Sequence, residues 1–578
     1  MIRLFFLTVF VVLTGAVTFD VHAQQDQTDP EQSLLPEIDP QDIEIRSQFQ
    51  ARFPGLNRQP ILGFNPRPRV FQTDPDRIPF IEDEEAILAS LPIGELDRPE
   101  APVYQRLGYA DPRYIFFRGG IGSEISPEAD LFAIGRINNR NWISANVNFT
   151  SSDGHAEAEN LDTSYRYSEA NINAYSRISD RTNLRFTAGA VSNFNHMLQL
   201  GTEWEEFLNT NTRVSLTGFR GSAKVDVAQT SLSGVVVDAM GYINDFSHNS
   251  DLTFLSGSAS EWGLNAGGEY TRLGRNVDEY HRVSLRTKSG GIEPLEGQMQ
   301  SWGVSNLSAH YERLFNYQTD LKVKAGISGV TDAEEDFKLY FTPTVEFKHT
   351  FFTGFNFRAK ASGSANHYSL AQVQQVNRFF DMSSPIRHQY EMLALAEIQL
   401  EPFYGTKIIG GVSYQDINNY LYYERRESHG GILEINQGYY SANFRDADIF
   451  KIYGGFTQDL RPDIIWFTAD GHWQTPNFSD TNEKIPFVEN LSLKATLSLR
   501  PVSQLLIESW GEFNSGRVDH TGEDMSSFMV MGGKLEMSLT DQFGFYAKIL
   551  NFLNEDYQLW QGYRERGLQG FVGLTYLF

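Results

Sequence analysis

The chain has 578 residues, far more than one ordinary globular core holds, so it forms either several soluble domains or one very large closed sheet. It contains 48 Lys and Arg residues and 73 Asp and Glu residues. The net charge of −25 argues against nucleic acid as a partner, because phosphate binding requires clustered cations. Cysteine is absent, which excludes disulfides, thiol chemistry and cysteine-ligated metal sites.

The first 23 residues have the pattern of a secretory signal peptide. Arg3 supplies the positive charge, residues 4–17 are apolar, and Val21-His22-Ala23 is a small-x-small cleavage site that predicts a mature start at Gln24. The apolar run is short for the alternative, a membrane anchor. No later stretch approaches the roughly 20 apolar residues of a spanning helix. An exported chain of this kind is either a secreted soluble protein or a β-barrel.

Residues 24–104 differ in composition from everything that follows. They contain more than half of the chain's 22 prolines and no lysine. Proline at this density prevents regular helix and central strand. We expect a proline-rich periplasmic segment, disordered up to about Asp42. Beyond that residue it is either a linker or an ordered segment against or inside a barrel mouth, and a candidate for docking a periplasmic protein.

From Tyr114 onward the sequence predicts strand after strand, with no helical segment of note. Alternating runs of apolar and polar residues are separated by turns. We predict about 22 strands, at 114–122, 129–137, 141–153, 163–178, 180–193, 213–227, 230–245, 258–270, 280–288, 302–315, 319–331, 337–350, 355–370, 387–402, 406–421, 446–459, 463–475, 488–500, 503–514, 527–539, 542–550 and 567–578.

The two faces of these runs differ in polarity. In residues 491–500 leucines and Ala495 alternate with Ser, Thr, Lys494 and Arg500, and residues 355–366 alternate in the same way. A soluble sandwich also alternates, but its strands average five or six residues. The longer runs here predict a barrel with an apolar outer face touching outer-membrane lipid and a polar inner face. We expect an inner lining that includes Lys322, Lys324, Arg358, Lys360, Lys494 and Arg500.

The predicted connections alternate between short and long. Short ones include Thr540-Asp541, Pro501-Val502 and Asn316–Gln318, whereas long ones include 551–566, 422–445 and 371–386. Outer-membrane barrels have short periplasmic turns and longer external loops. Aromatic residues flank the short turns, as expected at a lipid interface: Phe315, Tyr317, Phe351, Phe352, Phe403, Tyr404 and Trp466. The sequence therefore predicts an all-β, transmembrane antiparallel outer-membrane β-barrel over residues 105–578, with both chain termini in the periplasm of a Gram-negative bacterium.

The last hairpin resembles the closing strands of TonB-dependent receptor barrels. It reads YAKILNFLNEDY from Tyr546, then Trp560-Gln-Gly-Tyr563, and ends GLQGFVGLTYLF at Phe578. The resemblance covers about residues 110–578 and implies a barrel of similar size. Those receptors also carry an amino-terminal plug of well over a hundred residues, preceded by a short TonB-binding box. Residues 24–104 are too few and too proline-broken for that plug. They contain no convincing TonB-binding box, and Asp42–Arg46 is only a weak match to one. The resemblance therefore implies a form without the plug domain.

The sequence offers no catalytic, cofactor-binding or metal-binding residues to nominate. Its 12 histidines have no paired spacing, and neither a nucleophile elbow nor a phosphate-binding loop is present. Glu508 and Glu512 share a strand face with Trp510, which we interpret as polar lining of the lumen. The acidic, aromatic loop 422–440 is either a ligand-binding loop or a solvated surface loop. We therefore expect no enzyme activity and no cofactor.

Two functions remain open. The first is a transport-type barrel, receptor-like without a recognisable plug, that passes or binds an unknown solute. The second is a non-transport scaffold of the outer membrane, active in surface attachment or assembly through its loops or periplasmic arm. Conductance in a lipid bilayer discriminates between them.

Overall fold

The computed structural model describes residues 115–138, 140–153, 164–197, 212–230, 232–250, 256–274, 278–295, 297–333, 337–380, 382–425 and 440–578. The signal peptide predicted at residues 1–23 and the proline-rich segment predicted at 24–104 lie outside these residues.

The described residues form one antiparallel barrel of 22 strands, counting β12 and β13 as two pieces of one strand because both pair with β11. The strand number and the fold class predicted from the sequence are confirmed. The elements are β1 (Ile115–Gly122), β2 (Ser126–Asn138), β3 (Asn141–Ser152), β4 (Tyr165–Ser179), β5 (Thr182–Met197), β6 (Thr212–Thr230), β7 (Ser233–Ser250), β8 (Gly257–Leu273), β9 (Glu279–Glu293), β10 (Gln300–Phe315), β11 (Thr319–Thr331), β12 (Lys338–Phe341), β13 (Thr344–Phe352), β14 (Phe355–His367), α4 (Leu370–Val376), β15 (His388–Leu400), β16 (Thr406–Arg425), β17 (Tyr440–Arg461), β18 (Ile465–Phe478), β19 (Leu491–Val502), β20 (Leu505–Ser515), β21 (Phe528–Ser538), β22 (Phe543–Leu550), β23 (Gln558–Trp560), β24 (Tyr563–Arg564) and β25 (Gln569–Leu577).

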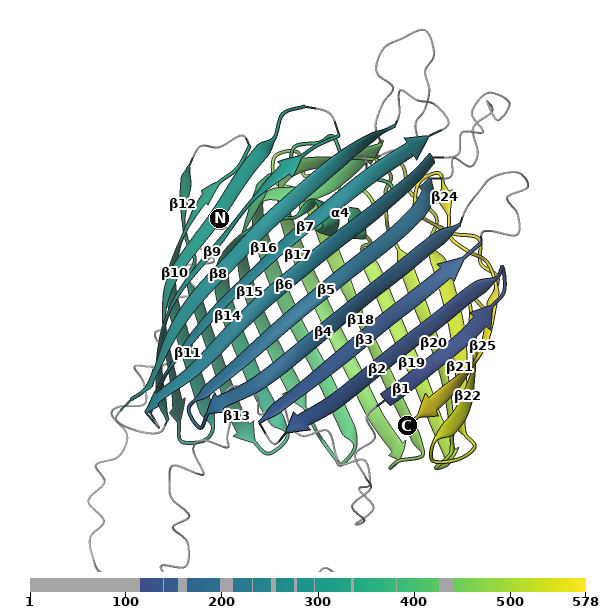
Figure 1. Ribbon diagram of the computed structural model, residues 1–578, viewed down its shortest axis with the longest axis horizontal. Helices are drawn as coiled ribbons and strands as arrows, with labels where there is room; N and C mark the ends of the chain where they lie inside the picture. The colour runs from purple at the N-terminus through teal and green to yellow at the C-terminus, as the bar shows by residue number, and fades with distance from the viewer. Residues whose placement is uncertain are drawn as a thin grey trace, which may run out of the picture. The chain divides into compact units, whose positions relative to one another are not determined.

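The barrel closes where its first and last strands meet. β1 pairs antiparallel with β25, in a register that joins Phe116 to Leu577 and Gly122 to Phe571. Every other barrel strand pairs with its neighbours in sequence, and the tilted strands follow one another around the wall (Figure 1). Closure joins the first strand of the sheet to the last, as a sheet in hydrocarbon requires because no water is there to satisfy the amides of an open end. The short pair β23 and β24 forms a separate two-stranded sheet within the last loop.

The strand alternation separates an apolar outer face from a polar inner face. On β19, Leu493 and Leu497 point outward and are 48% and 45% exposed. Lys494, between them, points inward and pairs with Glu512 on β20 at 3.4 Å. Because successive side chains point to opposite sides of a strand, this pattern along each strand places apolar side chains on the lipid-facing wall. The apolar-out, polar-in assignment from the sequence is confirmed.

The two ends of the barrel differ in their connections. One end carries tight turns, such as the one between β10 and β11, where Asn316 and Tyr317 adopt φ values of 52° and 55°. The start of β1 and the end of β25 lie at this same end, where the Phe578 amide donates to the Ile115 carbonyl at 2.8 Å. The other end carries the longer loops. The connection from β1 to β2 is an exception on that side, since it is a tight turn with positive φ at Glu124 and Ile125.

The strand-only expectation holds except at one place. Within the described residues the helix α4 interrupts the long connection between β14 and β15 (Figure 1). No helix in this part of the chain is long and apolar enough to cross a membrane.

The assignment of the outer face to lipid predicts that a charged residue destabilises the barrel more on that face than on the inner face. We expect Leu497→Arg, in the middle of β19, to lower the free energy of unfolding by about 2–4 kcal/mol, because the guanidinium would enter hydrocarbon. Thr496→Arg, on the inner face of the same strand, is the matched control and should cost much less. Guanidinium unfolding of the protein in lipid vesicles measures both, and equal costs would contradict the assignment of faces.

Candidate functional site

The connection between β14 and β15 folds into the barrel and forms the candidate site. We call residues 368–380 and 382–387 the inner strap. Its side chains Leu370, Val373 and Phe380 are fully buried. They share one apolar cluster with Val214 and Phe246, which lie on the inner face of β6 and β7. The strap therefore packs against the wall from inside and narrows the lumen at the loop end.

Near the loop end, the inner face of the strands changes from polar to apolar. Lower on β6, apolar residues such as Phe219 point outward, whereas Val214 and Leu216 point inward and are buried. On β10, Leu307 points outward, while Trp302 and Val304 point inward. Apolar residues on the inner face need an apolar partner inside the barrel. The reversal thus marks the height at which the strands leave the lipid and contact the strap.

Local sequence explains the helix in the strap. Ser369 is the N-cap of α4, and its hydroxyl accepts a hydrogen bond from the Gln372 amide at 3.1 Å. The Gln372 side chain accepts in return from the Ser369 amide at 2.9 Å, which completes a capping box. Leu370 and Val373, three residues apart, form the buried side. Gln372 and Gln375 lie on the side that remains exposed to the lumen.

A buried carboxylate on the wall holds the start of this helix. Glu261 on β8 is 2% exposed and accepts hydrogen bonds from the amides of Leu370 at 2.5 Å and Ala371 at 3.1 Å. The Asn244 side-chain amide donates to the same carboxylate at 2.6 Å. A carboxylate suits these positions because it accepts from the unpaired first amides of a helix. Glu261 is thus a specific docking point between wall and strap.

The end of α4 docks on the opposite side of the lumen. Tyr423 on β16 donates its hydroxyl to the Val373 carbonyl at 2.9 Å. Phe379 stacks on Tyr563 of the last loop with ring centroids 3.4 Å apart, and Arg378 pairs with Glu565 of that loop at 3.0 Å. The strap therefore spans from β8 to β16 and the last loop, and a layer of aromatic side chains closes this side of the mouth.

The base of the strap is fixed by a buried polar chain. His388, where β15 begins, contacts the Asp332 carboxylate through its Nδ1 atom, and its Nε2 atom lies 2.7 Å from the Tyr340 hydroxyl. Nearby, Trp302 stacks on His367 at the end of β14, with ring centroids 4.4 Å apart. His388, Asp332 and Tyr340 are buried and contact one another, so we assign them a structural role.

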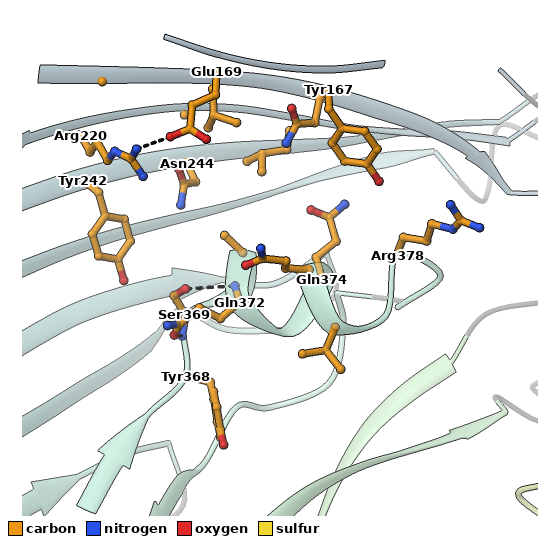
Figure 2. A pocket seen from close by; sticks show the side chains of 18 of the residues that line it. Tyr167, Glu169, Arg220, Tyr242, Asn244, Tyr368, Ser369, Gln372, Gln374 and Arg378 are labelled. Atoms are coloured by element: carbon orange, nitrogen blue, oxygen red, sulfur yellow. Dashed lines mark hydrogen bonds and ion pairs between the residues drawn. The ribbon is translucent and has the colours of Figure 1, made fainter. Parts of the chain in front are cut away.

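A cavity of about 1330 Å³ lies between the strap and the β1–β10 wall. Figure 2 shows α4 with Gln372 and Gln374 on one side and Tyr167, Glu169 and Arg220 on the other. Its walls mix amides, hydroxyls, aromatic rings and ion pairs. The volume exceeds the roughly 300–1,000 Å³ of pockets for drug-sized molecules, so the cavity admits a sizeable solute.

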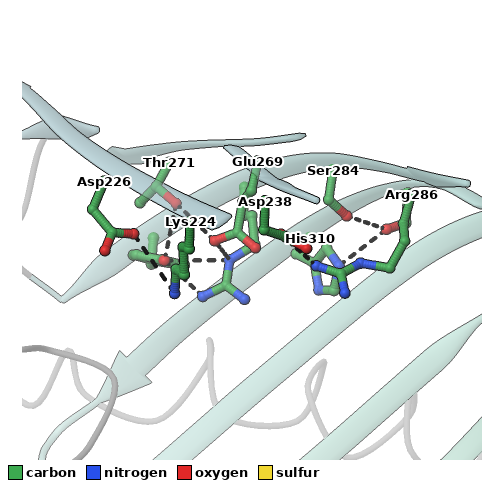
Figure 3. Close-up of polar contacts among 11 residues, drawn as sticks. Lys224, Asp226, Asp238, Glu269, Thr271, Ser284, Arg286 and His310 are labelled. Carbon is green, nitrogen blue, oxygen red and sulfur yellow. Dashed lines mark hydrogen bonds and ion pairs between the residues drawn. The ribbon is translucent and has the colours of Figure 1, made fainter. Parts of the chain in front are cut away.

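The inner wall next to this cavity carries an extended polar network. Arg286 on β9 pairs with Asp238 on β7 at 2.8 Å, and Arg282 pairs with Glu269 on β8 at 2.9 Å. Figure 3 shows Arg286 beside Asp238, with Lys224 and Asp226 on β6, Glu269 on β8, Ser284 on β9 and His310 on β10. Cross-strand pairs of opposite charge stabilise the wall and keep it compatible with water.

The lining residues predicted from the sequence lie on the inner face. Lys322 contacts Glu312 at 2.6 Å, and Arg358 donates to Glu346 at 2.9 Å. Lys324 and Lys360 occupy inward positions in the same registers. The Arg500 guanidinium lies 5.5 Å from the ring centroid of Trp466, whose strand partner is the inward-facing Ser498.

The other residues singled out from the sequence have ordinary roles. Glu508, Glu512 and Trp510 face the lumen on β20, where Glu512 pairs with Lys494 and Glu508 accepts from Ser498 at 3.4 Å. The interpretation as lumen lining is thus supported by the contacts. Of the loop predicted at 422–440, residues 426–439 lie outside the described residues. Across the part of the chain that the structure describes, no group of three His, Asp or Glu side chains is arranged to hold a metal ion.

Two further loops fold over the mouth and are held to each other by Asp519. This carboxylate, in the β20–β21 loop, accepts from the amides of Thr521 at 2.8 Å and Glu523 at 3.0 Å. Its other oxygen accepts from Gln561 of the last loop at 2.7 Å. Burial alone would raise the pKa of Asp519, but the hydrogen bonds from Thr521 and Glu523 bring that pKa below its ordinary value.

Comparison with known proteins identifies the fold. No family model matches the sequence, and no curated protein matches it. Among solved structures, the siderophore receptor PirA from Acinetobacter baumannii is 9% identical with a TM-score of 0.61, and 80% of each chain is covered. The FrpB iron transporter from Neisseria meningitidis is 9% identical with a TM-score of 0.64 over 82% of each chain. The copper transporter OprC is 11% identical with a TM-score of 0.61, over 81% of this chain and 80% of that one.

This chain has the barrel fold of these solved structures. The similarity in strand number and closure agrees with the resemblance of the last hairpin noted in the sequence. At these identities the likeness extends to the fold alone, so the lumen and the inner strap have to be interpreted from the residues of this chain.

The docking of the strap predicts a specific effect of Glu261→Gln. The substitution replaces one carboxyl oxygen by an NH₂ group, which cannot accept from a helix-start amide, and a net hydrogen bond contributes about 0.5–1.5 kcal/mol. We expect faster hydrogen exchange at Leu370, Ala371 and Gln372 while the barrel amides stay protected. Glu508→Gln, on the inner face away from the strap, is the control. Unchanged exchange in α4 would show that Glu261 does not hold it.

The Asp519 contacts predict a pH dependence with a defined sign. Folding lowers the pKa of Asp519 below its ordinary value of 3.8. The ionised carboxylate therefore stabilises the folded loops above pH 3.8, and this stabilisation is lost as the pH falls through the lowered pKa. Asp519→Asn should therefore increase local opening around Thr521 at pH 7 and should make no difference well below pH 3.8. Hydrogen exchange, corrected for intrinsic rates, measures this. A difference that persists at low pH would contradict the assignment.

Proposed function

We propose that this chain is a transport-type barrel of the Gram-negative outer membrane that passes or binds a solute through its lumen. The observation that carries the proposal is a closed wall with a water-compatible inner face that retains a large cavity next to the strap. A wall of 22 strands encloses far more space than its own side chains fill. In this chain the strap occupies part of that space.

The structural neighbours support this proposal by their names. PirA is named a siderophore receptor, and FrpB and OprC are named iron and copper transporters. A transport role agrees with an inner wall of charged and amide groups, since a barrel that served only as an anchor would have no need of a solvated cavity. Within this proposal the solute is unassigned, and the protein is not an enzyme.

The remaining parts of the proposal concern the chain ends and the amino-terminal segment. The described start and end of the barrel lie at the short-turn end, which supports an orientation with both chain termini in the periplasm. We infer that residues 24–104, after removal of residues 1–23, form a periplasmic segment that engages a periplasmic protein. In this proposal the chain has no separate plug domain, and the strap performs part of its obstructing role.

Channel measurements test the proposal directly. We expect the purified chain in planar bilayers to show low or intermittent conductance, because the strap narrows the lumen. Replacing residues 370–376 by a Gly/Ser segment of equal length should raise the conductance several-fold. A Gly/Ser replacement of the four exposed residues 479–482 of the β18–β19 loop is the control.

Two results would contradict the transport role. One is a closed bilayer with the full chain, with the chain lacking residues 24–104 and with the strap variant. The other is equal conductance of the strap variant and its loop control. Either result would favour the alternative of a scaffold that acts through its loops or periplasmic arm.

A further inference from the structure

The groups that line the cavity next to the strap indicate which class of solute it can bind. Of its charged lining groups, most are already paired with each other. Arg118 donates to Asp130 at 2.8 Å, and Arg220 contacts Glu169. Arg378 pairs with Glu565 at 3.0 Å. An ionic solute that bound to one of these paired groups would have to displace the partner of that group, which carries a desolvation cost.

The other charged residues that line the cavity are Glu128, Glu391 and Lys288. Glu128 accepts from Lys548 at 2.8 Å and from Tyr546 at 2.6 Å. Glu391 accepts from the neutral side chain of Gln415 at 2.8 Å, so this carboxylate is the anion left outside the ion pairs in the part of the lining that the structure describes. Lys288 is the cation left outside these pairs among the described lining residues. The cavity therefore offers no cluster of uncompensated charge of either sign to a solute.

The uncharged polar groups are of one chemical kind, because each can donate and accept. The amides of Gln375 and Asn148 and the hydroxyls of Tyr167 and Tyr242 line the cavity. No hydrogen bond to another described residue occupies these four groups. The Gln372 side chain uses its oxygen in the capping box, so its NH₂ group is available to the cavity. Amides and phenols of this type match a solute whose groups also donate and accept.

The positions of these groups suit a solute held from two sides. Gln372 and Gln375 are three residues apart on the lumen side of α4, which places them on one face. Tyr167 lies on the opposite wall, on β4, and Tyr242 lies on β7 (Figure 2). Trp560 of the last loop also lines the space. Aromatic rings provide flat apolar surfaces, and the amides provide fixed hydrogen-bond groups around them.

We propose that this cavity takes a neutral polyhydroxylated solute of the oligosaccharide class. Hydroxyl groups donate and accept in the way that the free amides and phenols require, and the carbon-bound hydrogens of a sugar ring suit the aromatic faces. The volume of about 1330 Å³ leaves room for several sugar units. This inference rests on the proposed transport function and specifies its substrate class.

The first test uses the unmodified protein and a series of solutes of similar size. Liposomes containing the full chain are placed in isosmotic solutions of maltotriose, trigalacturonic acid, the glucosamine trimer or a tripeptide with blocked termini. At low ionic strength we expect faster swelling with the neutral trisaccharide than with the anionic or cationic trimer. Swelling that is as fast or faster with a charged trimer or with the peptide would overturn the inference.

The second test uses the strap. Gln375→Ala removes a lumen-facing amide, and a net hydrogen bond contributes about 0.5–1.5 kcal/mol, or about 2- to 10-fold in affinity. We expect the maltotriose concentration that half-saturates the swelling rate to rise 2- to 10-fold. Tyr167→Phe should raise this concentration by a similar factor. Gln504→Ala, in the turn between β19 and β20, is the matched control and should leave the rate unchanged. If neither Gln375→Ala nor Tyr167→Phe changed this concentration, the result would count against the inference.

The two proposals fail in different ways. If liposomes with the full chain and with the strap variant admit none of the four solutes, the transport function fails. If they admit solutes without preference for the neutral trisaccharide, transport stands and the substrate class is wrong. Heat-modified migration on electrophoresis confirms that each variant has folded before it is measured.

Discussion

The structure depends on hydrogen-bond closure of one continuous sheet. β1 and β25, more than 400 residues apart in the chain, pair over seven positions, and their pairing completes the ring. In hydrocarbon an unpaired backbone group costs several kcal/mol, so an open sheet of this size is not a stable alternative. The ring then forces every strand to present one face to lipid and the other to the interior. The polarity of each face follows from this division.

The same division explains why an ordered segment can lie inside the barrel. Below the strap, inward side chains are charged or polar and are paired across strands, as with Arg286 and Asp238. Near the loop end, inward side chains such as Phe246 and Ile292 are apolar and would be unstable in a water-filled lumen. The strap covers them with Leu370 and Val373. Wall and strap are therefore complementary, and the remaining polar part of the interior forms the cavity.

The sequence predicted the barrel well because its signals are local. Alternation over ten or more residues and turn residues such as Asn316 identify strands without knowledge of their partners. The strap was not predicted, although two local signals were present. Ser369 and Gln372 have the spacing of a capping box, and the alternation of β6 reverses phase between Phe219 and Leu216. Its docking on Glu261, 109 residues from Leu370, is a non-local contact that periodicity cannot reveal. The cavity was missed for the same reason, since its residues come from many strands and two loops.

The inner strap is continuous with the wall at both ends, through β14 and β15, and its base is fixed by His388 and Asp332. A separate domain that obstructs a pore can in principle leave it entirely, whereas this segment remains tethered within the mouth in every state of the barrel. Movement of α4 away from its place would break its hydrogen bonds with Glu261 and Tyr423. In the proposed transport function, the tethered segment limits the size of the largest molecule that can cross, as the diameter of the wall also does.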